Sequence, residues 1–427
     1  MSAVPLSAAV FARLARTSPD PAGLTFLNTA LHHRRLLLLK ALLVRVHRHR
    51  ASVEPGALAG FERSWELLER VERRRPGAVR DVLDYPTTGA WLAGALTAPA
   101  GPALDRHLAR LDALAATAAL RCGGPLDLTV RTPDGLLSLP GTGRLRVAAE
   151  RVRFVADDRT VRFHPSGAGP AAPAALTLAR RPGGALADRG HGPGWSAVRA
   201  LPRGTARLDD LDPYRVPADA GGAFVGTAAE HADTDHAAWS ARWSAARDLL
   251  LRTDPGRAAE VARAVRVLVP LVGRGPRHLG ATLSAAPGAV LTSLPADGRG
   301  MAGTLVHELH HSKLATLHEI VPLYGPGRDA VHQVGWRPDP RPLAGVLHGA
   351  YAHLALADLW RRTATADGVP GSWRSAAGQQ FDDIHDQVGE ALAILLESDE
   401  LTAEGREFAD QMRQHHASLG AAPLAAG

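Results

Sequence analysis

Five consecutive residues in the third quarter of the chain have the types and spacing of a metal site. They read His307-Glu308-Leu309-His310-His311, an H-E-x-x-H pattern. Residues four apart lie on the same face of an α-helix, so His307 and His311 can present imidazole nitrogens to one metal ion. Glu308 lies one step round the helix, where it can act as a base or hold a water. The pattern therefore predicts a metal site on a helix.

The residues around this pattern predict the helix itself. Apolar side chains recur there at helical spacing, and Pro322 follows the last of them. The plain alternative is a histidine-rich helix face without metal, because the pattern arises by chance in a chain with 20 histidines. Burying an unliganded histidine pair between apolar flanks is costly, which favours the metal. We expect His310 to turn away from the pair, behind the site or on the surface. The apolar flanks are Leu305, Val306, Leu309, Leu314, Leu317, Ile320 and Val321.

A catalytic metal usually has three protein ligands and an open position, so a third ligand is needed. A metzincin peptidase places a histidine six residues after the second one, but this chain has Leu317 there. His318 faces the right way but lies roughly 10 Å along the helix axis from the pair. Neither residue is therefore the expected third ligand.

The next predicted helix, residues 343–362, offers the remaining candidates. It contains no glutamate of the kind a gluzincin peptidase uses, but it contains His348, His353 and Asp358. His348 and His353 are five residues apart, about 140° round a helix, so we do not expect both to reach one metal. We expect His353 to be the third ligand, with His348 as its substitute.

Length and composition set the class of protein. A chain of 427 residues with 45% hydrophobic residues can form two or three domains with sizeable cores. The formal charge of +6 comes almost entirely from arginine, since Lys40 and Lys313 are the only lysines. These charges are spread along the chain, so nucleic-acid binding is not expected.

Cysteine content and hydropathy indicate the compartment. Cys122 is the only cysteine, which excludes intramolecular disulfides and cysteine-ligated zinc or iron–sulfur sites. Residues 1–15 have no basic stretch before their apolar part, so a signal peptide is not expected. The apolar run 36–44 is interrupted by Lys40 and is far shorter than a membrane span. We expect a soluble cytoplasmic protein that does not bind membranes.

Helical and strand patterns divide the chain into three predicted segments. Residues 1–122 form an N-terminal helical region, residues 123–215 a β-rich module, and residues 216–427 a helical domain with the metal site. Short alternating runs separated by turn signals are typical of antiparallel strands. The fold class is therefore α+β, mainly α-helical with an inserted antiparallel β module. The predicted strands cover residues 126–131, 136–139, 145–148, 152–155, 161–164, 175–179 and 195–201.

Two shorter segments carry specific expectations. Residues 208–215 contain three aspartates but lack the glycine and glutamate of a calcium loop, so we expect a polar turn rather than a cation site. Residues 255–269 follow a helical pattern after Pro255, and we expect a helix there.

Several segments together resemble the α-ketoglutarate-dependent, HExxH-type peptide β-hydroxylases of actinobacterial gene clusters for ribosomally synthesised peptide natural products. The chain differs from members of that family at Leu309 and His310, where they often have an aromatic residue and glutamine, and at His348, where they tend to have glutamine. The likeness runs through most of the chain and is most specific between His307 and His353. Its segments are Leu305–Leu314 with Val321–Leu323, Trp336–Pro342, Gly345–His353, Tyr85-Pro86, Gly89–Trp91, Leu208–Arg215 and Glu400–Arg406.

The resemblance implies Fe(II), α-ketoglutarate (2-oxoglutarate) and O₂, with oxygen inserted into a β-carbon C–H bond of a precursor peptide. Iron oxygenases need few facial ligands and leave positions for cosubstrate and O₂. The distal carboxylate of α-ketoglutarate needs a cation, and arginine offers a bidentate clamp. Arg337 and Arg341 are expected in a proline-stiffened loop and are the candidate clamp, with Lys313 as a further candidate. The plain alternatives are exposed loop arginines and a helix-surface lysine. Glu308 would hold water or an outer histidine.

Two other functions stay open from the residues alone. A zinc metallopeptidase would use Glu308 as general base on a metal-bound water. A non-catalytic peptide-binding protein would keep the histidines without needing a metal. Replacing Glu308 by glutamine separates the first two hypotheses, because only the peptidase depends on that base.

Overall fold

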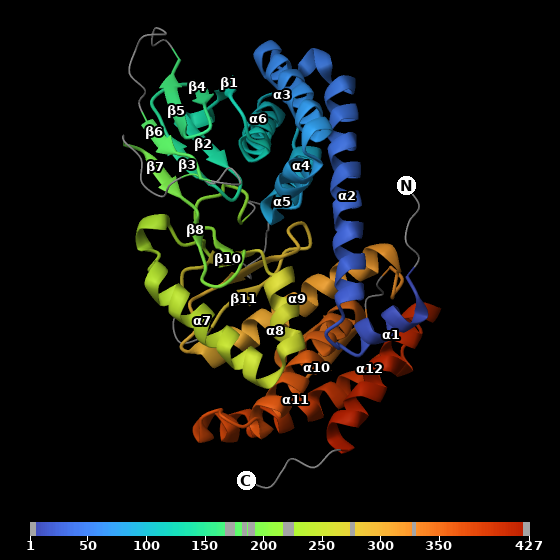
Figure 1. The fold of residues 1–427 in the computed structure, drawn as a ribbon. Coiled ribbons are helices and arrows are strands. Elements are labelled where there is room, and N and C mark those ends of the chain that lie inside the picture. Colours follow the sequence, from blue (N-terminus) through green and yellow to red (C-terminus); the bar gives the residue numbers. More distant parts are fainter. Residues whose placement is uncertain are drawn as a thin grey trace. The chain divides into compact units, whose positions relative to one another are not determined.

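The computed structural model describes residues 6–166, 176–181, 186, 193–216, 226–273, 278–326 and 330–421. They form a mainly helical α+β fold with several small sheets, which confirms the predicted fold class (Figure 1). The chain divides into two compact units. The first contains Met1–Ala30, Leu201–Ala206 and Asp235–Gly427, and the second contains Leu31–Ala200 and Arg207–Thr234. Among the described helices, none combines the length and apolar composition that a membrane span requires.

The second unit contains a helical part and a β-rich part. The helical part begins with the portion of α2 (Pro21–Arg48) that follows Ala30. It continues through α3 (Pro55–Arg74), α4 (Pro76–Leu83), α5 (Pro86–Thr97) and α6 (Pro102–Cys122). The strands are β1 (Leu126–Arg131), β2 (Leu136–Leu139), β3 (Gly143–Arg146), β4 (Arg151–Ala156), β5 (Thr160–Pro165), β6 (Leu176–Ala179), β7 (Trp195–Ala197), β8 (Arg199–Ala200) and β9 (Arg207–Leu208).

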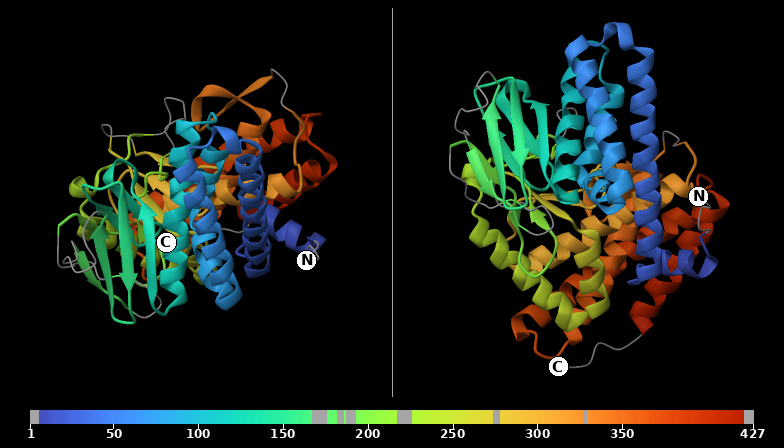
Figure 2. Two further views of the ribbon diagram at one scale, coloured as in Figure 1. Left: turned by 90° about the horizontal axis from the view of Figure 1, so that it is seen from above. Right: turned by 45° about the horizontal axis from the view of Figure 1, so that its top comes forward.

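Helix α6 joins the two parts of this unit, because both of its sides are buried. Its leucines at positions 104, 108, 111 and 114 pack into the core of the helical part. Ala113, Ala116 and Leu120, on its other side, pack into the core of the β-rich part. Figures 1 and 2 show α6 between α3 and the sheets. The predicted boundary after residue 122 therefore lies inside one unit, where helices and strands share α6.

Two antiparallel sheets form most of the β-rich part. One has the order β1-β4-β5-β6 and the other the order β2-β3-β7. Strand β1 lies at the end of the first sheet and pairs with β4 along its whole length, from Leu126 opposite Ala156 to Arg131 opposite Arg151. The predicted strand 195–201 is divided into β7 and β8, which belong to different ladders.

The aspartates of residues 208–215 lie in the interior of the second unit. Asp212 pairs with Arg110, and Asp210 pairs with Arg199. Asp209 accepts hydrogen bonds from the backbone of Leu211 and Asp212 and from the hydroxyl of Tyr85. The turn is polar, as predicted, but these carboxylates are buried and already have protein partners.

The first unit is built mainly from helices. They are α1 (Ala8–Ala15), the start of α2, α7 (His236–Thr253), α8 (Pro255–Ala264), α9 (Gly298–Ile320), α10 (Leu343–Thr365), α11 (Gly371–Glu397) and α12 (Ala403–Ala421). The strands are β10 (Val267–Pro270), β11 (Gly280–Ala281), β12 (Ala289–Thr292), β13 (Val331–Val334) and β14 (Arg337–Pro342). Helix α9 packs against α7 and α10, and α10 packs against α11 (Figure 1).

The prediction of one helix over residues 255–269 is wrong in its last third. Helix α8 ends at Ala264, and β10 follows and pairs in parallel with β12. Val265, Val267 and Val269 alternate there, and branched side chains favour a strand over a helix. All four residues of β10 are buried, which suits a strand inside a sheet.

Candidate metal centre

The H-E-x-x-H pattern lies on α9, which confirms the predicted helix. The helix begins at Gly298, where the Asp297 carboxylate accepts a hydrogen bond from the Gly300 N–H at 2.7 Å. It ends at Ile320, two residues before Pro322. Its apolar residues are buried on several sides, so packing fixes the direction of the histidine face.

His307 and His311 lie on one face of α9 with their rings together. Their Nε2 atoms are 3.0 Å apart, and their ring centroids are 4.6 Å apart. Two ligands bound at about 2.1 Å to one metal have donor atoms roughly 3.0–3.4 Å apart for the usual ligand angles. The pair therefore has the spacing of two ligands to one ion.

His353 on α10 lies beside this pair. Its ring centroid is 5.0 Å from that of His307. Its Nδ1–H donates to the Gly349 carbonyl at 2.8 Å, which leaves the lone pair on Nε2. The indole of Trp336 stacks on the same ring, with centroids 4.5 Å apart and planes at 18°. These contacts fix the tautomer and the ring plane, as the outer contacts of a metal-ligating histidine do.

His348 contacts a different member of the pair. Its ring stacks on His311, with centroids 5.9 Å apart and planes at 26°. The separation of 140° expected from the helix thus places His348 and His353 beside different rings of α9. Four imidazoles gather here, two from each helix, and we call these side chains of His307, His311, His348 and His353 the histidine group.

All four imidazoles are neutral near pH 7. Burial is the main cause and lowers the pKa of His307 well below its usual value, that of His311 to about 3, and those of His348 and His353 to about 4. Neutral imidazole is the form that binds a metal. In the part of the chain that the structure describes, however, no group of three or more histidine, cysteine, aspartate or glutamate side chains is arranged to hold a metal ion. The third ligand therefore stays a prediction.

Glu308 lies on the side of α9 that faces β11. A side chain at Gly280 would place its Cβ 2.8 Å from Glu308 Oε1, so the carboxyl lies against the backbone of that strand. Glu308 is 4% exposed, and burial raises its pKa to about 8. The missing side chain at Gly280 provides the space for this carboxyl group.

Lys313 and His310 contact residues of α8 and not the histidine pair. Lys313 Nζ donates to Glu260 Oε1 of α8 at 2.7 Å, and Arg257 donates to the other oxygen of Glu260 at 2.7 Å. His310 is fully buried rather than on the surface, and its Nε2 lies 3.1 Å from Arg257 Nη1. The structure therefore does not bring Lys313 to the candidate site but places it in a buried ion-pair network.

Arg337 and Arg341 lie on a strand, so the prediction of a loop is wrong. In the β13–β14 hairpin, His332 pairs with Arg341 and Val334 with Arg337. Pro338 and Pro340 lie between Arg337 and Arg341, and proline is tolerated on an edge strand where its missing N–H faces away from the partner. Both guanidinium groups contact the Asp339 carboxylate, at 3.2 Å and 3.1 Å.

Sequence reasoning missed the residues that hold the third histidine in place. Gly349 is one of them, because a Cβ there would lie 2.5 Å from the Trp336 ring. Its carbonyl also binds His353, so one glycine permits both contacts. The available signal was a glycine four residues before His353 and a tryptophan just before the helix. Arg257 and Glu260 gave no such signal.

No family model matches the sequence, and no curated protein is significantly similar to it.

Proposed function

We propose that this protein is an Fe(II)- and α-ketoglutarate-dependent oxygenase that hydroxylates the β-carbon of a residue in a ribosomally synthesised precursor peptide, during natural-product maturation. The observation that carries the proposal is the gathering of neutral imidazoles from His307, His311 and His353. The resemblance of the surrounding segments supplies the metal, the cosubstrate and the peptide substrate.

The Nε2 atoms of His307 and His311 face each other at 3.0 Å, and a cation bound to both would take up their lone pairs. Only one proton fits between the two Nε2 atoms, so one of them donates to the other and the pair contains no further donor at this contact. Imidazole nitrogen suits both iron and zinc. Bound iron would supply oxygen activation, and the three histidines would hold it.

The arginines of β14 support binding of an α-keto acid. Arg337 and Arg341 lie on the same side of the strand, and their side chains are 30% and 32% exposed. Both bind Asp339, so an incoming carboxylate would compete with a carboxylate of the chain itself. The same hairpin carries Trp336, which stacks on His353. We therefore assign these arginines the distal carboxylate of α-ketoglutarate.

A zinc peptidase is the second candidate, and the position of Glu308 favours it. The carboxyl group is buried next to the histidine pair and faces the backbone of β11. A peptidase needs a base beside a metal-bound water, and a glutamate next to two histidines can serve. In the oxygenase, the same group would hold a water or orient a histidine.

The test is anaerobic binding of Fe(II) and α-ketoglutarate to the purified apoprotein. We expect a weak visible charge-transfer band in the wild type and none in His307→Ala. Arg341→Ala should weaken α-ketoglutarate binding about ten- to hundredfold, because it removes charge-assisted hydrogen bonds. His318→Ala is the matched control, since His318 lies on the same helix but stacks on Tyr324. Asp339→Asn should tighten α-ketoglutarate binding, because it removes the carboxylate that competes for Arg337 and Arg341.

A different set of results would support the zinc peptidase instead of the oxygenase. Zinc retained at one per chain, no charge-transfer band, and cleavage of peptide bonds that Glu308→Gln abolishes would establish the peptidase. Hydroxylation that survives in Glu308→Gln would rule the peptidase out.

A further inference from the structure

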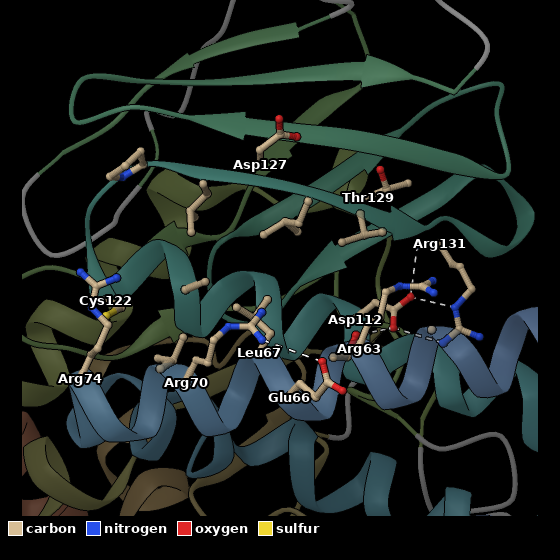
Figure 3. A pocket seen from close by; sticks show the side chains of 18 of the residues that line it. Arg63, Glu66, Leu67, Arg70, Arg74, Asp112, Cys122, Asp127, Thr129 and Arg131 are labelled. Carbon is tan, nitrogen blue, oxygen red and sulfur yellow. Dashed lines mark hydrogen bonds and ion pairs between the residues drawn. The ribbon is translucent and has the colours of Figure 1, made fainter.

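A groove of about 800 Å³ lies in the second unit and shares no residue with the histidine group of the first unit. Helix α6 forms its floor, and α3 and β1 form its two sides (Figure 3). Every residue of β1 lines it. The groove therefore follows the edge of a sheet along the length of one strand.

Among the described residues, no strand pairs with the groove side of β1. The Thr132 N–H donates to the Glu150 carbonyl, on the β4 side. Backbone groups alternate along a strand, so those of Leu126, Leu128 and Val130 also point toward β4. The N–H and carbonyl groups of Asp127 and Thr129 then point into the groove. An unpaired edge of this kind is a template for another strand.

One carboxylate already occupies the far end of this edge. Asp112 of α6 accepts a hydrogen bond from the Arg131 N–H at 3.3 Å. The Arg131 side chain binds both oxygens of the same carboxylate, at 2.8 Å and 3.1 Å. The chain itself thus provides an acceptor to the outermost N–H of β1 and ends the free edge there. The open positions are those of Asp127 and Thr129.

The opposite side of the groove is basic. Arg63, Arg70 and Arg74 of α3 are exposed and recur at seven and four residues, which places them on one face of the helix (Figure 3). Among the described residues, neither Arg63 nor Arg74 forms an ion pair, while Arg70 has a distant one with Glu66 at 3.9 Å. These guanidinium groups are available to carboxylates of a bound chain.

The floor between these sides is apolar. Ala119 of α6, Leu67 of α3, and Leu126 and Leu128 of β1 all line the groove. A strand that pairs with β1 would present alternate side chains to this floor and the others outward. Apolar residues fit the floor, and acidic residues fit the arginines on α3. The groove therefore suits a peptide segment in which apolar and acidic residues alternate.

We propose that an extended acidic peptide segment binds in this groove as an added strand, paired with the edge of β1 and held by Arg63, Arg70 and Arg74. The assignment of this segment to the peptide that the metal site modifies rests on the proposed function. The binding itself does not, because no residue of the groove belongs to the histidine group. Main-chain pairing gives affinity in such complexes, and the side-chain pattern gives selectivity.

The test uses a synthetic fluorescein-labelled peptide in which glutamate alternates with valine and leucine over ten residues. Anisotropy titration of the full chain should show saturable binding that weakens as salt concentration rises. Two altered peptides separate the interactions. Glutamine in place of glutamate removes the charge, and N-methylation of alternate residues removes the backbone donors. We expect each to weaken binding about tenfold or more.

Protein variants locate the site. The triple variant Arg63→Gln, Arg70→Gln, Arg74→Gln should weaken binding of the glutamate peptide about tenfold. Arg73→Gln is a control on α3, because Arg73 is exposed but does not line the groove, and it should change the affinity less than twofold. His307→Ala should bind the peptide as the wild type does. That result would show that peptide binding in the groove does not depend on His307, whatever the outcome of the iron-binding experiment.

Three outcomes would overturn the inference. The first is no binding of the glutamate peptide, and the second is binding that neither the arginine variants nor N-methylation changes. The third is a wild-type dimer that the triple arginine variant converts to a monomer in sedimentation, because a second copy of the chain would then cover the edge.

Discussion

Two histidines of the first unit share one local arrangement but have different surroundings. The Nδ1 of His310 lies 2.7 Å from the Val306 carbonyl, and that of His353 lies 2.8 Å from the Gly349 carbonyl, in each case four residues earlier. The Nε2 of His310 accepts a hydrogen bond from Arg257, and burial, with the charges of Lys313 and Arg257, lowers the pKa of His310 well below its usual value. The Nε2 of His353 meets no donor among the described residues. The contacts that each ring makes with other elements therefore distinguish a structural histidine from a candidate ligand.

The buried ion pair of Lys313 leads to a prediction for a single substitution. It is 3% exposed and pairs with Glu260, so its ammonium belongs to a buried network rather than to a cosubstrate. Breaking a buried pair by removing one partner leaves an uncompensated charge. We expect Lys313→Met to lower the free energy of unfolding by about 3 kcal/mol. Urea denaturation measures this, and the affinity for α-ketoglutarate should stay within about twofold of the wild type.

Lys40→Met is the matched control, since Lys40 is the only other lysine and is exposed on α2. It should change the free energy of unfolding by less than about 0.5 kcal/mol. A stable Lys313→Met protein that no longer binds α-ketoglutarate would restore the role first expected for this lysine.

At the scale of elements, Gly349 is one point where α10 packs closely against the β13–β14 hairpin. A Cβ at Gly349 would lie 2.5 Å from Trp336, whose ring covers His353. We expect Gly349→Ala to push the hairpin away and to lower the free energy of unfolding by about 1–3 kcal/mol. Metal content after dialysis should fall too, because His353 loses the ring that fixes its plane.

Gly378→Ala in α11 tests whether this effect is local. Nothing lies within 4 Å of a Cβ at Gly378, so alanine there should instead stabilise the helix by up to about 1 kcal/mol. Equal destabilisation by both changes would mean that the contact with Trp336 has no special role.

Elements differ in how far the sequence predicts them. Helix α9 and strands β1 and β2 follow from periodicity: the apolar residues of α9 are mostly buried, and those of β1 and β2 are buried or half-buried. The hairpin strand β14 was missed because alternating prolines normally argue against a strand, and only its pairing with β13 shows that they occupy the outer edge. The sequence predicted the members of the histidine group, but ring planes and tautomers depend on partners outside the motif.

At the scale of the whole molecule, one buried carboxyl should influence how stability depends on pH. Burial, with the nearby charge of Asp212, raises the pKa of Asp209 from 3.8 to about 6. The folded state therefore binds this proton more tightly than the unfolded state. The resulting stability is present below about pH 4 and is lost as the pH rises through about 6, on the order of 3 kcal/mol.

Asp209→Asn should remove this dependence. The amide keeps an acceptor oxygen for the Leu211 and Asp212 N–H groups that Asp209 binds. The wild type should therefore lose stability relative to the variant between pH 4 and pH 7 in urea titrations. Asp158→Asn, in the exposed β4–β5 turn, controls for the loss of a charge. A constant difference between wild type and Asp209→Asn across that range would contradict the assignment.

Cys122 is the last residue of α6 and lines the groove beside β1 (Figure 3). It is partly exposed and is the only thiol in the chain. A maleimide or iodoacetamide reagent therefore modifies one known position of the natural sequence. The alkylation rate of Cys122 therefore measures how far the groove is occupied, since a strand lying in the groove would shield the sulfur. A fluorophore attached there would report on the same groove from inside it.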